Sequence, residues 1–213
     1  RFDRLWSHRR AMQPTTLTHA GCGLAMTPVL VCAHCRTTVR AHDVRYEDGP
    51  GAGLERMPSP RSSRRIAAPP DESAKLHLLA GESIDHFGDR WTQQVLSTFF
   101  LGARRFDDIR KQCGVATNIL ADRLKLLVEH GTLQRRVCAA DPRHHEYVLT
   151  PKGMDLYPII LTLMKWGDRW LAGKSGPPLI LHCARCNHVL DAVVACDQCG
   201  GRLDPHDVSF RRR

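Results

Sequence analysis

Seven of the nine cysteines stand in two short stretches, at a spacing that could hold metal ions. In the C-terminal stretch, Cys183-x2-Cys186 is followed after nine residues by Cys196-x2-Cys199. Two such knuckles bring four thiolates around a tetrahedral zinc ion. Four protein ligands leave no open coordination position, so the spacing predicts structural zinc rather than a catalytic metal. Disulfide bonds are the alternative chemistry for these cysteines.

The chain repeats itself without a gap at an offset of 164 residues, which relates residues 1–44 to 165–208. The match extends beyond the cysteines, because Trp6 falls on Trp170 and the tripeptide His-Asp-Val recurs late in both halves. Convergent cysteine spacing does not explain these matches, so we interpret the repeat as a duplication. The matching C-terminal residues end a long amphipathic segment. We therefore expect residues 1–17 to be the tail helix of an upstream repeat that is otherwise absent from the chain.

The repeat also supplies the ligand that the N-terminal stretch lacks. The offset carries Cys183 onto His19, which predicts a second zinc site of three cysteines and one histidine. His42 is a competing ligand, but its counterpart His206 lies beside a site that already has four cysteines. The sequence thus predicts two structural Zn²⁺ ions, one in each repeat. The ligands are His19, Cys22, Cys32 and Cys35 for the first ion, and Cys183, Cys186, Cys196 and Cys199 for the second.

Composition divides the remaining chain into a main domain and small modules. Residues 46–74 are rich in Gly, Pro, Ser and Arg without an apolar period, which predicts a flexible linker. On either side we expect small zinc-ribbon β modules at 18–45 and 180–208. Sustained helical and strand patterning places the main domain at 75–173. The expected fold class is mainly α with small β: one winged helix-turn-helix domain and two zinc-ribbon-like modules.

The main domain has the pattern of a helix-turn-helix. Apolar spacing predicts helices over 76–87 and 91–101, a short helix that ends at Cys113 and Gly114, and a fourth helix over about 117–130. On the fourth helix, Leu120, Leu124 and Leu127 share one face and polar residues occupy the other. A short helix, a tight turn and a helix with a polar outer face form the arrangement that places the second helix in the DNA major groove. The alternative for these helices alone is a core scaffold with a solvated outer face.

A basic hairpin follows the fourth helix. Residues 132–140 and 145–150 read as strands around a turn that contains Pro142, which is the arrangement of a wing. The chain carries a net charge of +9, and residues 104–143 hold nine Lys or Arg against five Asp or Glu. This excess favours a nucleic acid partner, with salt-dependent phosphate contacts. The phosphate candidates are Arg104, Arg105, Arg135, Arg136 and Arg143.

Residues 88–172 resemble the HxlR-type (MarR-like) winged helix-turn-helix transcriptional regulators. The motifs are W-T, G-x-R-R-F, L-x-x-R-L-x-x-L, G-x-L-x-R-R and Y-x-L-T-x-x-G, in this order. The resemblance implies a homodimeric regulator that binds double-stranded DNA, with helix 117–130 in the major groove and residues 139–145 at the minor groove or backbone. Only a subset of HxlR-like proteins carries a C-terminal ribbon, and the resemblance extends to the ribbon of this chain only for that subset. The DNA-facing residues expected from the resemblance and from the outward faces are Arg104, Arg105, Thr117, Asn118, Ala121, Asp122, Arg123, Lys125, Arg135, Arg143 and His144.

The chain departs from the HxlR pattern at two places. Thiol-sensing members carry a cysteine near the start of the first helix, where this chain has Leu78, which argues against redox sensing there. Ala116 and Thr117 replace the usual Ser-Pro at the start of the recognition helix, which shifts the helix cap. Cys113 and Cys138 are read as small buried hydrophobes, with thiol sensing as the alternative.

An apolar stripe runs along the predicted helix over 154–171. A core helix accounts for part of this stripe, and the resemblance implies that the same helix pairs with its equivalent across a two-fold dimer axis. A cofactor site is the weaker alternative. The residues assigned to the dimer helix are Leu156, Ile160, Leu163, Trp166 and Trp170.

Other classes of function fit the sequence less well. No nucleophile elbow, phosphate-binding Gly loop or open metal site indicates an enzyme. The competing hypothesis is that the ribbons are protein-interaction or redox-switch modules on a winged-helix dimerisation scaffold. No apolar run approaches the roughly 18 residues of a membrane span, so we expect a cytoplasmic, nucleoid-associated protein with no membrane partner. A small-molecule effector of unknown chemistry that binds between the dimer helices is a further partner compatible with the sequence.

Overall fold

The computed structural model describes residues 16–53, 90–139 and 141–211. The chain forms two compact units. The winged unit holds the described residues between 90 and 160, and the ribbon unit holds 16–53 and 161–211. Three predicted features lie outside the described residues: the tail helix except Thr16 and Leu17, the helix over 76–87, and residues 54–74 of the linker.

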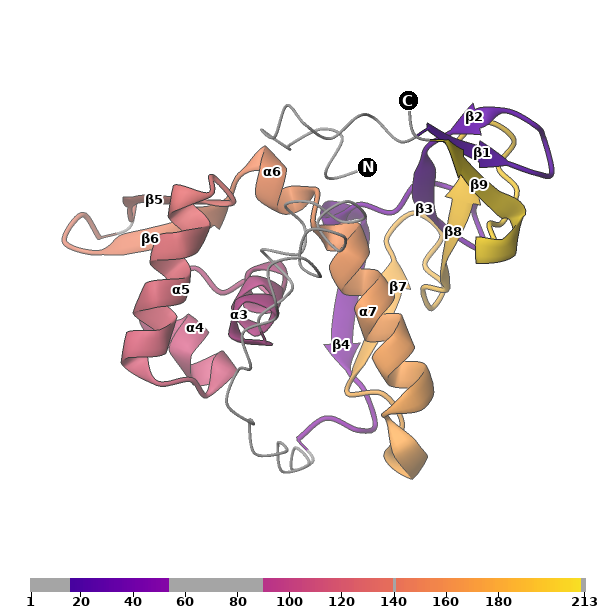
Figure 1. Ribbon diagram of the computed structural model, residues 1–213. Coiled ribbons are helices and arrows are strands. Elements are labelled where there is room, and N and C mark those ends of the chain that lie inside the picture. The colour runs from indigo at the N-terminus through magenta and orange to yellow at the C-terminus, as the bar shows by residue number, and fades with distance from the viewer. Residues whose placement is uncertain (1–15, 54–89, 140, 212–213) are drawn as a thin grey trace, which may run out of the picture. The chain divides into compact units, whose positions relative to one another are not determined.

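The winged unit has the helix-turn-helix and the hairpin that the sequence predicts (Figure 1). Its helices are α3 (Arg90–Phe100), α4 (Phe106–Cys113), α5 (Thr117–Glu129), α6 (Pro151–Met154) and the start of α7 (Tyr157–Trp170). Between α5 and α6, strands β5 (Leu133–Val137) and β6 (His145–Leu149) form an antiparallel pair.

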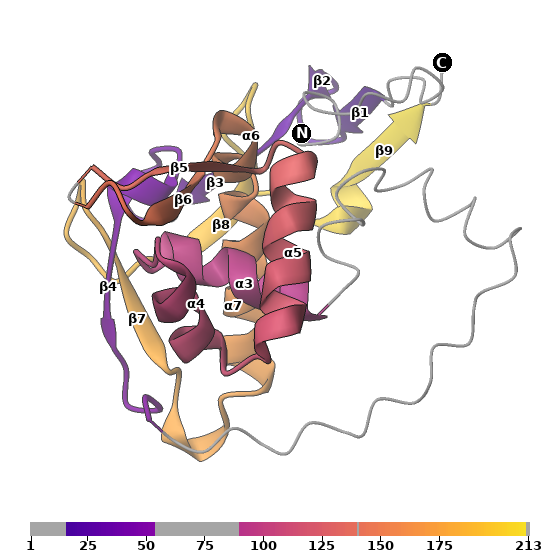
Figure 2. The ribbon, with the colours of Figure 1, turned by 90° about the vertical axis from the view of Figure 1, so that its left-hand side faces the viewer.

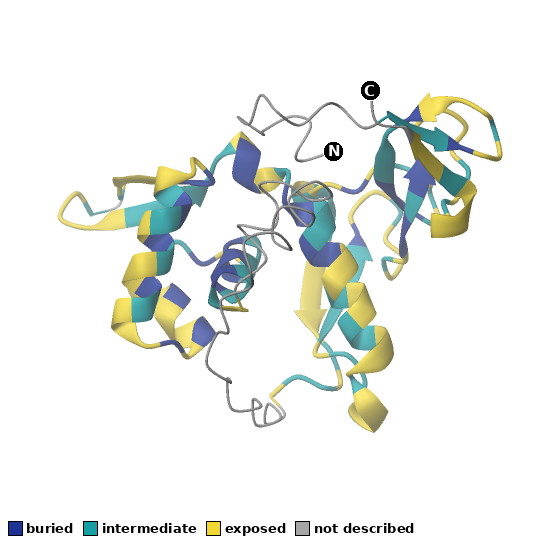
Figure 3. Cartoon of the chain, in the orientation of Figure 1, coloured by how far each residue is buried: buried dark blue, intermediate teal, exposed yellow. Residues whose placement is uncertain are grey.

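The core of the winged unit lies where α3, α4 and α5 meet (Figure 2). Leu96 and Phe99 of α3 and Ile109 of α4 are completely or almost completely buried there. Leu120 and Leu124 of α5 are buried against them, while the opposite face of α5 is exposed (Figure 3). The apolar period of the sequence therefore identifies the inward face of α5 correctly, because burial of this stripe is what holds the helix in place.

A tight junction fixes the end of the wing to α6. The Thr150 hydroxyl donates to the carbonyl of Gly131 at 2.6 Å and accepts the backbone N–H of Gly153 at 3.2 Å. A Cβ on Gly153 would lie 2.3 Å from the carbonyl oxygen of Thr132, so only glycine fits this approach. The junction also corrects the prediction of one continuous helix from residue 154. α6 ends at Met154, and α7 begins at Tyr157.

The ribbon unit consists of short strands with 3₁₀ turns between them. In the N-terminal half these are β1 (Thr16–His19), β2 (Ala25–Met26), β3 (Pro28–Cys32) and β4 (Val44–Asp48). In the C-terminal half they are β7 (Leu179–Cys183), β8 (Ala192–Cys196) and β9 (Val208–Arg211).

Every sheet of the ribbon unit joins the two halves of the repeat. The sheets have the orders β2-β1-β9, β3-β8 and β4-β7. β3 pairs antiparallel with its own counterpart β8, and Leu30 lies opposite Val194, which is its equivalent in the repeat. The pair of His19 with Val208 in β1-β9 recurs as the pair of Cys183 with Val44 in β7-β4. The two halves are thus related by a pseudo-two-fold axis through the centre of β3-β8.

This pairing corrects the prediction of two separate ribbons at 18–45 and 180–208. Val31, Val193 and Ala195 form one shared buried cluster, so the apolar strand of each half is covered by the other half. A ribbon of fewer than 30 residues has too little chain to form a stable core without a metal or a partner. The pairing also moves the start of the predicted linker. Residues 46–48 belong to β4, and Gly49 donates its backbone N–H to the carbonyl of Pro178 at 2.9 Å.

Candidate nucleic-acid interface and metal centres

The turn between α4 and α5 is closed by a left-handed residue. Gly114 has φ 61° and donates its backbone N–H to the carbonyl of Arg110 at 2.9 Å. A left-handed C-cap suits glycine, because a Cβ is strained at positive φ. Val115 is buried in the turn, and α5 begins at Thr117 after Ala116, whose side chain offers no cap hydrogen bond. The chain reverses within three residues, as a helix-turn-helix requires.

The outward face of α5 presents most of the predicted recognition residues. Thr117, Asn118, Ala121, Asp122 and Lys125 are exposed. Lys125 forms an i,i+4 ion pair with Glu129 at 3.8 Å. Arg123 differs from the rest, since it is only half-buried at the border of this face. The exposed face is a polar surface of mixed charge, held rigidly by the leucines on the other side of the helix.

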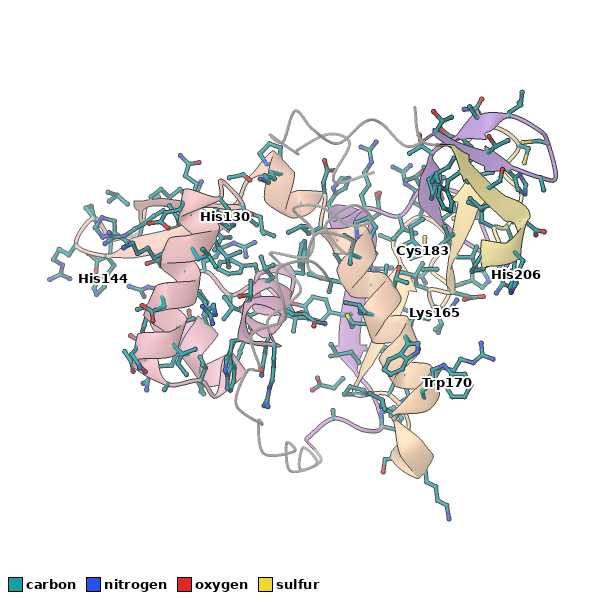
Figure 4. The ribbon with its side chains drawn as sticks, in the orientation of Figure 1. His130, His144, Lys165, Trp170, Cys183 and His206 are labelled. Atoms are coloured by element: carbon teal, nitrogen blue, oxygen red, sulfur yellow. The ribbon has the colours of Figure 1, made fainter. Side chains whose placement is uncertain are left out.

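The tip of the wing is organised around Asp141. Its carboxylate accepts the backbone N–H of Arg143 at 3.1 Å and pairs with the guanidinium of Arg143 at 3.1 and 3.2 Å. His144 Nδ1 lies 2.9 Å from the same carboxylate, and Figure 4 shows the His144 side chain at the tip. The hydrogen bonds from Arg143, followed by the contact with His144, lower the pKa of Asp141 to about 2. The two predicted DNA contacts at the tip therefore share one counter-ion.

The remaining arginine candidates have different surroundings. The guanidinium of Arg104 donates to the carbonyls of Phe99 at 2.7 Å and Ala103 at 2.8 Å, so it caps the end of α3. Arg105 and Arg135 are exposed. The sequence could not distinguish Arg104 from Arg105, because the difference depends on which side chain turns back to the helix end. Arg136, also a phosphate candidate, pairs across the hairpin with Glu146 at 2.7 Å.

The apolar stripe of the predicted dimer helix divides into a buried and an exposed part. Leu156 and Ile160 are 0 % and 2 % exposed, so they are core residues. Leu163, Trp166 and Trp170 are 39 %, 56 % and 63 % exposed, and Figure 4 shows Trp170 projecting from α7. Only this second part is free to pack against another molecule.

The eight predicted metal ligands gather into two clusters in the ribbon unit. The His19 cluster comprises His19, Cys22, Cys196 and Cys199, and the Cys32 cluster comprises Cys32, Cys35, Cys183 and Cys186. Within each cluster all ligand atoms lie within 4.8 Å of one another. The eight residue identities match the prediction, but the grouping is different. Each cluster takes one knuckle from each half of the repeat.

The distances within the clusters fit a tetrahedral metal. The Sγ atoms of Cys32 and Cys186 are 3.8 Å apart, as are those of Cys35 and Cys183. A tetrahedron with zinc–sulfur bonds of about 2.3 Å has sulfur–sulfur edges of about 3.8 Å. A disulfide bond needs about 2.05 Å, and all these cysteines are free thiols. Three or four sulfur donors with at most one imidazole are the ligand set that zinc prefers.

All four knuckles have the same backbone. In each, the residue after the second ligand is left-handed, with φ between 61° and 70°, and its N–H donates to the carbonyl of the first ligand. These residues are Gly23, Arg36, Asn187 and Gly200. Near one knuckle, the Thr37 hydroxyl lies 2.6 Å from Cys35 Sγ. This hydrogen bond, with one from the Thr37 backbone, lowers the pKa of Cys35 to about 6 and favours the thiolate that binds metal.

His19, and not His42, lies with the three cysteines of the His19 cluster. His19 is buried, and its Nδ1 lies 3.3 Å from Cys199 Sγ. His42 is outside both clusters, beside the Asp43 carboxylate at 3.7 Å. His34 is exposed and stacks on His188 with ring centroids 3.5 Å apart, and both rings lie near Cys186.

Two features of the clusters were missed by the sequence analysis. The first is the crossed grouping of the knuckles. The sequence contains one indication of this grouping. No turn-forming pair of residues follows Pro28, so the chain runs straight through β3 to Cys32 and keeps the two knuckles of this half apart. The second is Gly21, where an added Cβ would lie 2.9 Å from Cε1 of His19. The equivalent position beside Cys183 holds Arg185, so glycine accompanies the larger imidazole ligand.

Comparisons with known proteins place the winged unit among transcriptional regulators. Residues 86–175 match the family model described as HxlR-like helix-turn-helix. The uncharacterised HTH-type transcriptional regulator Rv3095 of Mycobacterium tuberculosis is 36% identical over 137 residues, covering 62% of this chain and 87% of the relative. The corresponding regulator YvaP of Bacillus subtilis is 31% identical over 91 residues, covering 42% and 84%. The alignment with Rv3095 is longer than the family-model match, so similarity continues beyond the winged unit.

A solved structure gives the same result. The crystal structure of PA1607, a candidate transcription factor, superposes with a TM-score of 0.57 at 30% identity. The superposition covers 65% of this chain and 99% of PA1607. Among the described residues, no helix has both the length and the apolar character needed to span a membrane.

Proposed function

The chain belongs to the HxlR-like helix-turn-helix family of transcriptional regulators, and we propose that it recognises a pseudo-palindromic DNA operator as a homodimer. The observation that carries the proposal is the exposed polar face of α5. This face stands on a helix whose opposite side is locked into the core, directly after a tight turn and directly before a basic hairpin. A recognition helix needs this combination of rigidity and exposure to enter the major groove in one register.

Base recognition falls to the exposed side chains in the first turns of α5. Asn118 offers an amide that can pair with adenine through two hydrogen bonds, and Lys125 can donate to guanine acceptors. Thr117 and Ala121 present methyl groups that suit thymine. Asp122 can accept a hydrogen bond from the amino group of cytosine, and its negative charge repels DNA phosphates from this part of the helix face. Arg123 is less accessible and contributes at the border of the contact.

Phosphate contacts fall to the arginines that flank α5. Arg105 at the start of α4 and Arg135 on β5 are exposed on loops and strands next to the recognition helix. Arg143 and His144 reach the backbone or the minor groove only if they share or exchange their contact with Asp141. Arg104 is not part of this set, because its Nη1 already donates to two carbonyls at the end of α3.

A second copy of the chain would pack on the exposed part of α7. Leu163, Trp166 and Trp170 recur at three and four residues, so they form one apolar ridge on the helix. An isologous dimer places this ridge on both sides of a two-fold axis. As in other dimeric helix-turn-helix proteins, we expect the two recognition helices to meet half-sites about one helical turn apart, roughly 34–36 Å. In this arrangement the zinc ions are structural and act on the ribbon unit, and the site of action is the bacterial nucleoid.

Selection of genomic fragments on the full chain tests the proposal, with footprinting of the selected DNA at physiological salt. We expect a protected site with two half-sites. Asn118→Ala should change the preferred base at one position of each half-site, by about 1–3 kcal/mol. Arg135→Ala should instead weaken all sequences alike and reduce the salt slope by about 1. Arg202→Ala, at an exposed arginine of the ribbon unit, is the matched control and should change neither. Binding without preference over bulk DNA would refute the proposal.

A further inference from the structure

We propose that two zinc ions fasten the N-terminal half of the repeat to its C-terminal half through crossed centres, the His19 cluster and the Cys32 cluster. In this arrangement each half of the repeat supplies two of the four ligands of both ions. The inference concerns the ribbon unit alone and does not depend on DNA recognition.

The length of β3 explains why one half cannot close a centre by itself. β3 is extended from Pro28 to Cys32, a span of about 13 Å at roughly 3.3 Å per residue. The knuckle of His19 and Cys22 lies before this strand, and the knuckle of Cys32 and Cys35 lies at its far end. Ligands of one zinc ion lie within about 4 Å of one another, so the two knuckles of one half cannot share an ion.

The antiparallel partner strand supplies the missing ligands at each end. In β3-β8, Pro28 lies opposite Cys196 and Cys32 lies opposite Ala192. The start of β3 is therefore next to the C-terminal knuckle that begins at Cys196. Near its end, Cys32 Sγ is 3.8 Å from the Sγ of Cys186. Because the pairing is symmetric about Leu30, both centres form by the same geometry.

Backbone hydrogen bonds between the halves hold the knuckles in this crossed arrangement. Ala20 donates its N–H to the carbonyl of Asp207 at 2.7 Å, and the equivalent Ala184 donates to the carbonyl of Asp43 at 2.8 Å. Ala33 donates to the carbonyl of Asp191 at 2.8 Å. These hydrogen bonds to the opposite half position the knuckles without any contribution from a metal ion. Such preorganised ligands are what a tight metal site requires.

The donors suit zinc in both centres, but the two centres differ chemically. The Cys32 cluster offers four sulfurs, and the His19 cluster offers three sulfurs and one imidazole nitrogen. Both are closed sets of four protein ligands. Co²⁺ can replace Zn²⁺ as a probe, since its absorption spectrum distinguishes four-sulfur coordination from coordination by three sulfurs and one nitrogen.

Matched pairs of cysteine substitutions in the full chain separate crossed centres from separate ribbons. Cys22→Ser with Cys196→Ser removes two ligands of the His19 cluster and leaves the Cys32 cluster complete. Cys22→Ser with Cys32→Ser removes one ligand from each cluster, although it leaves all four C-terminal cysteines. Each variant lacks two cysteines, so the general loss of stability is comparable.

The measurement is zinc bound per chain by native mass spectrometry, together with the Co²⁺ spectrum. The unsubstituted chain should bind about two ions, the Cys22/Cys196 variant about one with a four-sulfur spectrum, and the Cys22/Cys32 variant none tightly. Cys35→Ser with Cys186→Ser is a second check and should leave one ion with a three-sulfur, one-nitrogen spectrum. One ion retained by the Cys22/Cys32 variant and none by the Cys22/Cys196 variant would show separate ribbons. That result, or an unsubstituted chain without zinc, would overturn the proposal.

Discussion

Gly21 lies two residues after His19, where an added methyl group would press on the imidazole. An ideal Cβ on Gly21 would be 2.9 Å from Cε1 and 3.0 Å from Nε2 of His19, whereas ordinary contact begins at 3.4 Å. The ring would have to move by the difference, about 0.5 Å, while metal–ligand distances tolerate about 0.2 Å. His19 is buried, so the ring has little space into which it can move.

We therefore expect Gly21→Ala to weaken zinc at the His19 cluster by about 10- to 100-fold, or about 1.4–2.7 kcal/mol. The Cys32 cluster should keep its affinity, because none of its ligands contacts Gly21. Competition with a chromophoric chelator measures the two affinities, and the Co²⁺ spectrum identifies the weakened centre. Arg185→Ala is the matched control, since the equivalent position beside Cys183 already carries a Cβ.

A compensating substitution tests the cause of the weakening. His19→Cys combined with Gly21→Ala should restore the affinity, because a thiolate is smaller than an imidazole and coexists with a side chain at the equivalent position 185. Equal weakening of both centres by Gly21→Ala, or no weakening at all, would refute the steric explanation. Weakening that the added cysteine fails to repair would refute it as well.

Two further predictions concern the winged unit. Gly153→Ala should destabilise this unit by about 1–3 kcal/mol, because the new Cβ meets the Thr132 carbonyl at 2.3 Å, and an unchanged midpoint in thermal unfolding would contradict the clash. Asp141, whose pKa is lowered from 3.8 to about 2, should stabilise the wing above its unfolded pKa and lose this contribution as the pH falls through about 2. NMR titration of the carboxyl group checks this value, and a midpoint near 3.8 would show that Arg143 and His144 do not hold the carboxylate in solution.

Local pattern was sufficient to predict the helix-turn-helix and the hairpin of the winged unit. The period of Leu120, Leu124 and Leu127 gave the orientation of α5, and the glycine at position 114 marked the turn before it. These features depend on neighbours within a few residues, so they can be predicted from the local amino-acid sequence. Two features of this unit were not predicted. These are the break between α6 and α7, and the guanidinium of Arg104, which turns back to the end of α3.

The identity of the candidate metal-binding residues was determined by the sequence, and their grouping was decided by the tertiary structure. Knuckle spacing is a local property, and the repeat at offset 164 was enough to find His19 as the eighth member of the two clusters. Which knuckles share an ion depends on which strand covers Val31, and that strand lies more than 160 residues away in the sequence. Two equivalent halves place their candidate ligands at the same spacing, with His19 where the other half has Cys183, so the sequence is compatible with both pairings. Burial of each strand against its counterpart selects the crossed one.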